Sequence, residues 1–150
     1  MRMRLTLGII VPAFFIIAGA PAAVAGDTIC DGTISLGTFD NIIVPSGASC
    51  TLNGTVVVNG NVQADGAEEV AIVGTSLDLI EIGGDVQITN SGNVGIHFAN
   101  IGGNVQLEKN SGDEVEIDDS IIVGNLQCEN NIPNLEFSGN IVDGDLDCSN

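Results

Sequence analysis

Four cysteines are the first residues in this sequence whose type and spacing could support chemistry. Cys30 and Cys50 are 20 residues apart, and Cys128 and Cys148 are again 20 residues apart. Zinc and redox sites typically place cysteines in CxxC pairs or beside several histidines, and this chain has neither a CxxC motif nor more than one histidine. Disulfide formation is therefore the chemistry we expect.

Carboxylates form the second group. The segment "SGDEVEIDDS" at 111–120 is rich in acids, and hard cations such as calcium prefer oxygen ligands of this kind. The candidate calcium ligands are Glu116, Glu136 and Asp118. No stretch matches an EF-hand or a calcium-binding nonapeptide repeat. A solvated acidic surface is therefore the alternative, and it is the one we favour.

The lone histidine, His97, is expected to lie at the surface beside the carboxylate of Asp118 in the next repeat. A catalytic role would need a nucleophile or a second base nearby, and the sequence offers none.

A repeat of about twenty residues must position these groups. The phrase "GGNVQL" at 102–107 returns in related form four more times, and its glycines are spaced by 24, 19, 21 and 20 residues. A fixed period of this length predicts a solenoid, in which each repeat buries its apolar face against its neighbours. The glycines are Gly60, Gly84, Gly103, Gly124 and Gly144.

Alternation within each repeat predicts half-buried strands. Aligning the repeats on glycine gives an apolar column at Val62, a polar column at Gln63 and an apolar column at Ala64. A second strand follows around Val70, and a less regular third strand precedes the next glycine. We therefore predict an all-β, right-handed parallel β-helix with about 20 residues per coil and five to six coils. The longer first interval predicts an enlarged corner near "VGTSLDL" at 73–79.

The column after each glycine predicts a hydrogen-bonded ladder at one corner. Glycine permits a positive φ, and Asn and Asp tolerate tight turns and bond to nearby backbone. We expect these side chains to stack along the rod as an amide ladder. The members are Asn61, Asp85, Asn104, Asn125 and Asp145.

The repeat also predicts the cysteine pairing. Because each pair is separated by one repeat length, its members should share one column on neighbouring turns, at a distance that suits a disulfide. The disulfides Cys30–Cys50 and Cys128–Cys148 are then expected to join the last turns at the two ends of the rod. Closing a loop of about 20 residues contributes about 3 kcal/mol to the free energy of unfolding.

The first 25 residues have the layout of a secretory signal peptide. Arg2 and Arg4 precede an apolar run, and Ala23-Val24-Ala25 forms a small-residue cleavage site. The predicted mature domain, residues 26–150, contains no further run that could span a membrane. Lys109 is then its only strong base against 20 acids, which excludes nucleic acid as a partner. Secretion provides the oxidising compartment that disulfides need.

The segment "ICDGTISLGTFDNIIVPSGASCTLNGT" and the "GGNVQ" and "GNLQC" repeats resemble an uncharacterised group of small secreted bacterial proteins. The resemblance covers essentially the whole mature chain, and it implies a secreted β-helix without a known activity. The more acidic ending "DGDLDCSN" departs from that group. The corners also resemble those of bactofilins, which lack a signal peptide and these cysteines, so that likeness concerns the fold alone.

These observations predict a secreted, non-enzymatic, disulfide-stapled module with an extracellular structural or surface-interaction role. Enzymes on β-helices that act on acidic polysaccharides use Lys and Arg, which this mature chain almost lacks. The partner is expected to be an extracellular or cell-surface molecule. The acids at both ends, such as Asp27 and Asp147, favour a monomer. The alternative is a calcium- or cation-dependent binding protein that uses stacked carboxylates, and no other cofactor is expected.

Overall fold

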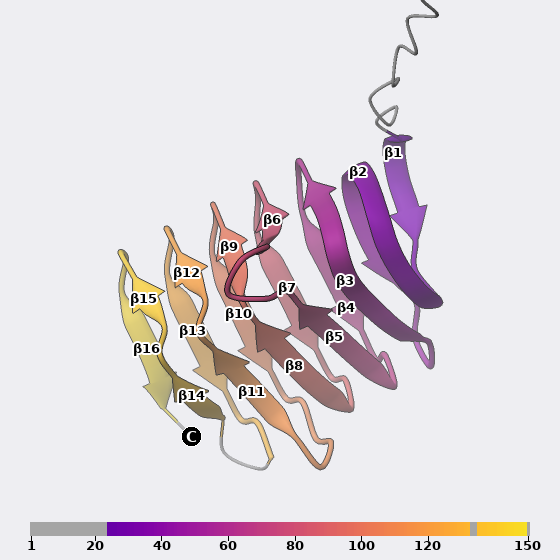
Figure 1. The fold of residues 1–150 in the computed structure, drawn as a ribbon. Helices are drawn as coiled ribbons and strands as arrows, with labels where there is room; N and C mark the ends of the chain where they lie inside the picture. Colours follow the sequence, from indigo (N-terminus) through magenta and orange to yellow (C-terminus); the bar gives the residue numbers. More distant parts are fainter. Residues whose placement is uncertain (1–23, 133–134, 150) are drawn as a thin grey trace, which may run out of the picture.

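The chain forms a β-solenoid of about six turns. The computed structural model describes residues 24–132 and 135–149, in which all regular structure is strand and neighbouring strands run parallel. Figure 1 shows the turns stacked along one axis, with β1 at one end and β14 to β16 at the other. The predicted all-β parallel β-helix with about twenty residues per turn is confirmed. The right-handed sense of the β-helix stays a prediction. The signal peptide predicted at 1–25 also stays a prediction, and its residues 1–23 lie outside the described part of the chain.

Three stacks of strands form the walls of the rod. Two long strands, β2 (Gly32–Val44) and β3 (Ser49–Val58), bend around corners and contribute to more than one stack. The first stack contains β1 (Val24–Ile29), the end of β2, β4 (Val62–Asp65), β7 (Val86–Thr89), β10 (Val105–Glu108), β13 (Leu126–Glu129) and β16 (Leu146–Ser149).

The second stack contains the starts of β2 and β3, followed by β5 (Glu69–Val73), β8 (Asn93–His97), β11 (Val115–Asp118) and β14 (Glu136–Ser138). The third stack contains later parts of β2 and β3, followed by β6 (Ile80–Ile82), β9 (Ala99–Ile101), β12 (Ile121–Ile122) and β15 (Ile141–Val142).

The register of the first stack confirms the alignment of the repeats. Val62 pairs with Val86, and Val105 pairs with Leu126, so one apolar column runs along the rod. These side chains are completely buried, whereas the glutamines between the apolar columns are partly or fully exposed. Burial alternates because successive strand residues point to opposite faces of the wall.

The interior is a single aliphatic core that runs the length of the rod. Ile72, Ile96 and Ile117 stack in register on the second wall, and Ile82 and Ile101 stack on the third. All five side chains are at most 1 % exposed. Each turn therefore buries its apolar face only by contact with the turns on either side, as expected of a solenoid.

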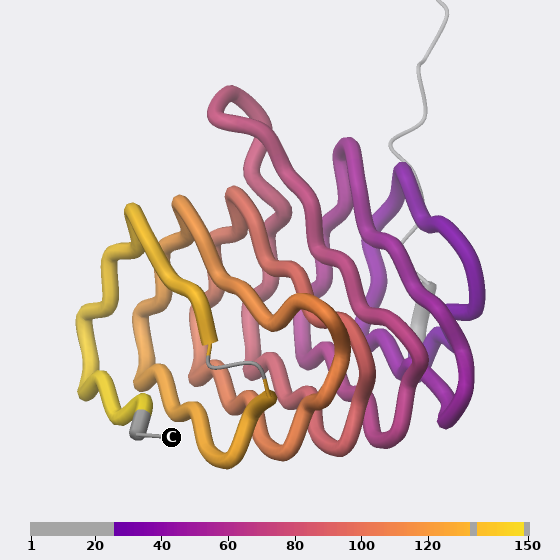
Figure 2. The backbone as a smooth tube through the Cα atoms, turned by 90° about the horizontal axis from the view of Figure 1, so that it is seen from below, coloured from indigo at the N-terminus to yellow at the C-terminus, as the bar shows by residue number. Residues whose placement is uncertain are grey.

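The predicted enlarged corner is an excursion between β5 and β6. Thr75 and Asp78 form an isolated antiparallel bridge, with Thr75 N–H donating to Asp78 O at 2.9 Å. Leu77 at its tip is 97 % exposed, and Figure 2 shows the loop projecting from the rod. The sequence did not indicate β9, whose short stretch Ala99-Asn100-Ile101 carries little strand signal by itself.

The explanation predicted for the corner glycines is wrong. None of the five has a positive φ; glycine is instead required because the preceding turn lies too close. A Cβ on Gly103 would lie 2.6 Å from the carbonyl carbon and oxygen of Gly84, which real Cβ atoms do not approach so closely. The repeated glycine thus marks a close approach between turns.

Candidate functional site

Two disulfides join successive turns near the two ends of the rod. Cys30 bonds to Cys50 with a Cα–Cα distance of 5.5 Å, and Cys128 bonds to Cys148 at 4.4 Å. Both pairings are as predicted. Cys30, Cys50 and Cys128 are almost completely buried, so most of the sulfur lies in the core.

The predicted shared column holds for only one of the pairs. Cys128 and Cys148 are register partners on β13 and β16. Cys50 lies in the second stack, where its register partner is Gly32. Cys30 lies at the end of the first stack, directly after Ile29. This disulfide therefore crosses a corner between two walls, because the first turn is shorter than the later repeats.

The corner ladder continues through the turns from Asn41 to Asp145, but most of its bonds join a side chain to backbone. The predicted bond between side chains forms at one step, where Asn104 Nδ2 donates to Asp85 Oδ1 at 3.1 Å. In each step a side-chain oxygen accepts a hydrogen bond from the backbone N–H of the next turn; Asn104 Oδ1, for example, accepts from Asn125 N–H at 3.0 Å. Asn and Asp are interchangeable here because both supply that oxygen. The remaining steps join Asn41 to Asn61, Asn61 to Asp85, Asp85 to Asn104 and Asn125 to Asp145, at 2.7–2.9 Å.

A second ladder, which the sequence analysis missed, lies inside the rod between the first and second walls. Asn110 is 0 % exposed; its Oδ1 accepts from Ser91 N–H at 3.0 Å and its Nδ2 donates to Ile88 O at 3.0 Å. Asn131 repeats this pattern one turn later. Their sequence context, a short polar run between strands, is also typical of an exposed turn, so burial was not evident.

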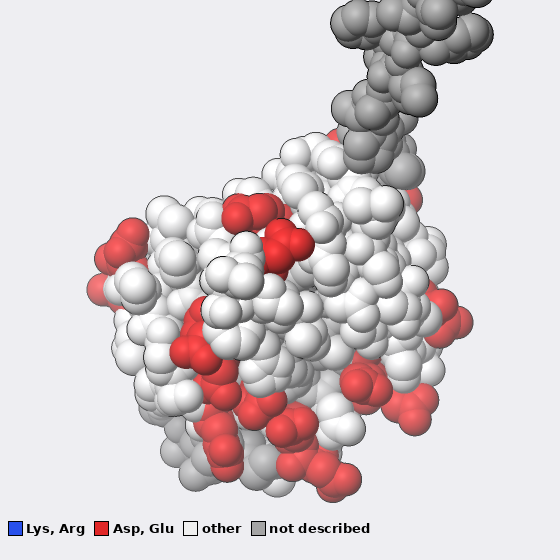
Figure 3. Space-filling model, viewed as in Figure 1, with Lys and Arg blue, Asp and Glu red and all other residues white. Residues whose placement is uncertain are grey.

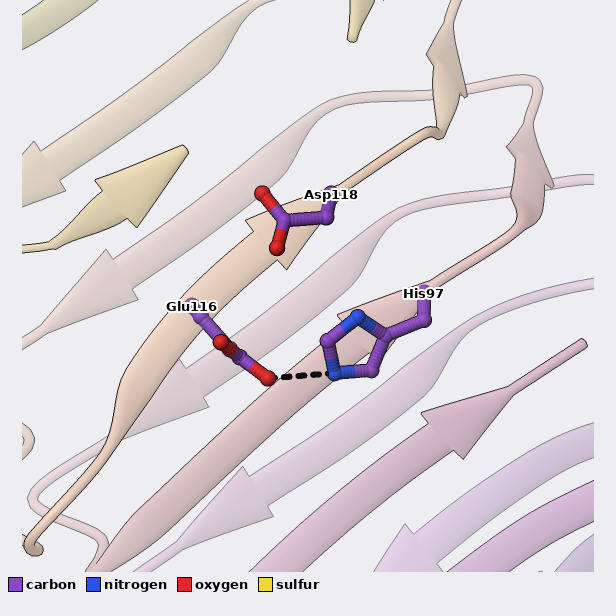
Figure 4. Close-up of side chains that lie close together, drawn as sticks. All are labelled: His97, Glu116 and Asp118. Carbon is purple, nitrogen blue, oxygen red and sulfur yellow. Dashed lines mark ion pairs between the residues drawn. The ribbon is translucent and has the colours of Figure 1, made fainter. Parts of the chain in front are cut away.

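His97, Glu116 and Asp118 form the one group of potential metal ligands found in the described residues. Their ligand atoms all lie within 4.8 Å of one another. Figure 4 shows His97 on β8 and both carboxylates on the adjacent β11, with the histidine Nε2 2.6 Å from Glu116 Oε1. We call these three residues the histidine cluster.

Alternation along the second wall explains the cluster. Residues that precede or follow an inward isoleucine point outward, so Glu116 and Asp118 flank Ile117, and His97 follows Ile96. His97 is the register partner of Asp118, as predicted. Its ion pair, however, is with Glu116, whose own partner is Gly95, so the contact is diagonal across two strands.

The surroundings of Glu116 shift the pKa of its carboxyl. Partial burial raises the pKa of the Glu116 carboxyl above its ordinary value of 4.5, the proximity of His97 lowers it, and the like charges of Glu114 and Asp118 raise it further. The net effect is a raised pKa. A cation beside this group would relieve the repulsion between the carboxylates.

The predicted calcium ligands are only partly brought together. Glu116 and Asp118 belong to the histidine cluster, whereas Glu136 lies in register with Glu116 on the neighbouring β14. Glu136 and Glu116 instead line a hollow of about 100 Å³ together with Asp113, Glu114 and Val115.

The surface of the rod is acidic in the view of Figure 3, in which carboxylates are spread over the visible face and no lysine or arginine is seen. On the first wall lies a groove of about 460 Å³, which we call the glutamine groove. Its lining includes Gln63, Gln87 and Gln106 and one carboxylate, that of Asp65. Gln63 Nε2 donates to Gln87 Oε1 at 3.1 Å, so neighbouring amides are ordered along the rod.

These features define the class of molecule as a disulfide-linked β-solenoid with a partly buried histidine cluster on one wall. No protein-family model, curated protein or solved structure matches the chain. Within the described residues, no helix is long and apolar enough to cross a membrane.

Proposed function

We propose that the protein is a secreted, non-enzymatic β-helix that acts as an extracellular structural or surface-interaction module. The observation that carries this proposal is the pair of disulfides, one near each end of the rod. Terminal turns have a neighbour on one side only, so they are where a solenoid opens first. Covalent bonds at these places suit a protein that must persist in an oxidising compartment.

The outer walls support an interaction role. The glutamine groove offers uncharged amide donors and acceptors beside the single carboxylate of Asp65, whereas the rest of the surface carries many carboxylates. A partner of this groove would be polar and neutral or basic, since an acidic partner would be repelled. The absence of enzymatic activity is part of the proposal, since residues 26–150 contain a single histidine, a single lysine and no arginine.

The proposal is tested by following the full chain in a bacterial host. We expect mass spectrometry to find a protein that begins at Gly26 in the periplasm or medium, with all four cysteines protected from thiol reagents until reduction. Recovery of an uncleaved, reduced chain in the cytoplasm would contradict the proposal. Comparing the amounts bound to cells and free in the medium for the native chain and Gln87→Ala tests the groove.

A second candidate function is calcium- or cation-dependent binding by stacked carboxylates. The observation that favours it is the register of Glu116 with Glu136 and of Glu108 with Glu129, since like charges on neighbouring strands are destabilising unless they are screened. The test compares the melting temperature with calcium and with chelator at matched ionic strength. A calcium effect no larger than that of sodium chloride would remove this candidate.

A further inference from the structure

We infer that His97, Glu116 and Asp118 form a binding site for one divalent metal ion of the zinc class. The three side chains come from the adjacent strands β8 and β11 and present one nitrogen and two carboxylates within 4.8 Å. Imidazole nitrogen combined with carboxylate oxygen is a donor set that zinc uses in proteins. This inference goes beyond the structural role, which needs no metal.

The distances suit a small ion. Zinc binds nitrogen and oxygen at about 2.0–2.2 Å in a tetrahedral arrangement, so two of its ligand atoms lie about 3.4 Å apart. In the histidine cluster, one ligand atom from each residue lies within 4.8 Å of the other two. The contact of His97 Nε2 with Glu116 Oε1 is 2.6 Å. The required separation falls between these values. Small side-chain rotations that open the His97–Glu116 contact would admit the ion.

Neighbouring residues hold the ligands in place. Asp118 Oδ1 accepts hydrogen bonds from Ser138 N–H at 2.7 Å and Ser138 Oγ at 2.9 Å, which orients the carboxylate from the next turn. Its other oxygen has no hydrogen-bond partner among the described residues. Such outer contacts are typical of ligands that are ordered before the metal arrives. Gly95 lies opposite Glu116, and the absence of a side chain there leaves room for the His97 ring.

The donor set selects against calcium. Calcium takes about six to eight oxygen ligands, and this cluster offers two carboxylates and an imidazole. Three protein ligands leave a fourth zinc position for water, because the His97 and Glu116 side chains remain 26 % and 18 % exposed. The bound ion would join β8 and β11, two successive turns of the second wall, whereas the Cys128–Cys148 disulfide joins strands of the first wall.

The experiment titrates the full-length oxidised chain, stripped with chelator, with zinc in a calorimeter. We expect one saturable site per chain, a rise in melting temperature, and little competition from excess calcium. Cobalt bound in place of zinc should give the visible absorption of a four- or five-coordinate ion. An absence of saturable zinc binding would overturn the inference, as would calcium competing as well as zinc.

Matched variants locate the site. His97→Gln and Glu116→Gln should weaken zinc binding by about tenfold or more, since each removes a ligand while keeping a similar side-chain size. The control is Glu136→Gln, which removes the next carboxylate in the Glu116 stack but no member of the cluster. Its zinc affinity should match that of the native chain. If Glu136→Gln and His97→Gln lose affinity equally, the ion is held by general acidity and the inference is wrong.

Discussion

The buried ladder gives the sharpest test of what holds successive turns together. We compare Asn110→Ala, inside the rod, with Asn104→Ala on the exposed corner ladder. In both cases the native asparagine accepts a backbone N–H from a neighbouring turn at 3.0 Å. Asn110 is 0 % exposed, whereas Asn104 is exposed to water. The pair therefore separates the loss of a hydrogen bond from the burial of an unpaired group.

The expected magnitudes differ severalfold. Asn110→Ala leaves the Ser91 N–H without its acceptor and removes the donor to Ile88 O, and each buried unpaired group costs about 1–3 kcal/mol. We therefore expect a loss of about 2–6 kcal/mol in the free energy of unfolding. For Asn104→Ala, water can replace the side-chain oxygen, so the loss should be about 0.5–1.5 kcal/mol.

Urea unfolding of the oxidised proteins measures both values. The slope of free energy against denaturant must be the same for the two variants, because a changed slope would mean that turns open separately. Equal losses for the two variants would refute the reasoning, since burial would then not decide the cost. A smaller loss for Asn110→Ala than for Asn104→Ala would refute it more strongly.

Three further predictions concern the close approach, the disulfides and the histidine cluster. Gly103→Ala should lower the free energy of unfolding, measured in urea, by about 1–3 kcal/mol, because the added Cβ meets backbone of the preceding turn. Gly95→Ala should cost less, because its Cβ meets only the movable His97 ring, and equal costs would contradict this prediction. Replacing Cys128 and Cys148 by serine should cost about 3 kcal/mol and promote proteolysis near the end of the rod first; unchanged cleavage would contradict it. The raised pKa of Glu116 means that the folded state binds the carboxyl proton more tightly than the unfolded state does. The stabilisation that comes from this proton is complete below pH 4.5 and is lost as pH rises through the folded-state pKa. In chelator, stability should therefore fall more steeply over that range for the native chain than for Glu116→Gln, and parallel curves would contradict the assignment.

The strands were predictable because one simple rule governs most of the chain. Alternation around Gln63 and Gln87 identifies inward and outward positions without any knowledge of long-range contacts. Since every strand pairs with the strand one repeat later, aligning the sequence with itself is equivalent to reading the register. The prediction failed at Cys30, where the first turn is shorter, and at β9, where a three-residue strand gives too little alternation.

The site geometry was less predictable because it depends on diagonal contacts. Aligning repeats places Asp118 beside His97, but the ion pair forms with Glu116, two residues earlier on the same strand. A one-dimensional alignment gives register partners and says nothing of how a long side chain leans. The same limit made Glu136 a predicted ligand: it is the register partner of Glu116, while the histidine lies on the other side of β11.

The residue types in the buried ladder are explained by which buried backbone N–H groups need a side-chain acceptor. The N–H of Ala67 needs an acceptor from the next turn, and Ser91 Oγ supplies it at 3.1 Å; the N–H of Ser91 in turn needs Asn110. Ala67 itself can be an alanine because the corresponding N–H one turn earlier, that of Ala48, already bonds to Pro45 O at 3.1 Å.

At the corner between the second and third walls, polar side chains again serve as acceptors for buried backbone N–H groups. The N–H of Ile80 bonds to Phe98 O at 3.1 Å, so its neighbour Ala99 needs no polar side chain, whereas Ser120 must supply an acceptor for the N–H of Ala99. A polar residue is thus present in these columns only where the preceding turn leaves a buried donor unpaired. Ser120→Ala should therefore destabilise the rod, whereas Ala99→Ser should provide no compensating bond. Urea unfolding of these two variants would contradict the rule if Ala99→Ser proved stabilising.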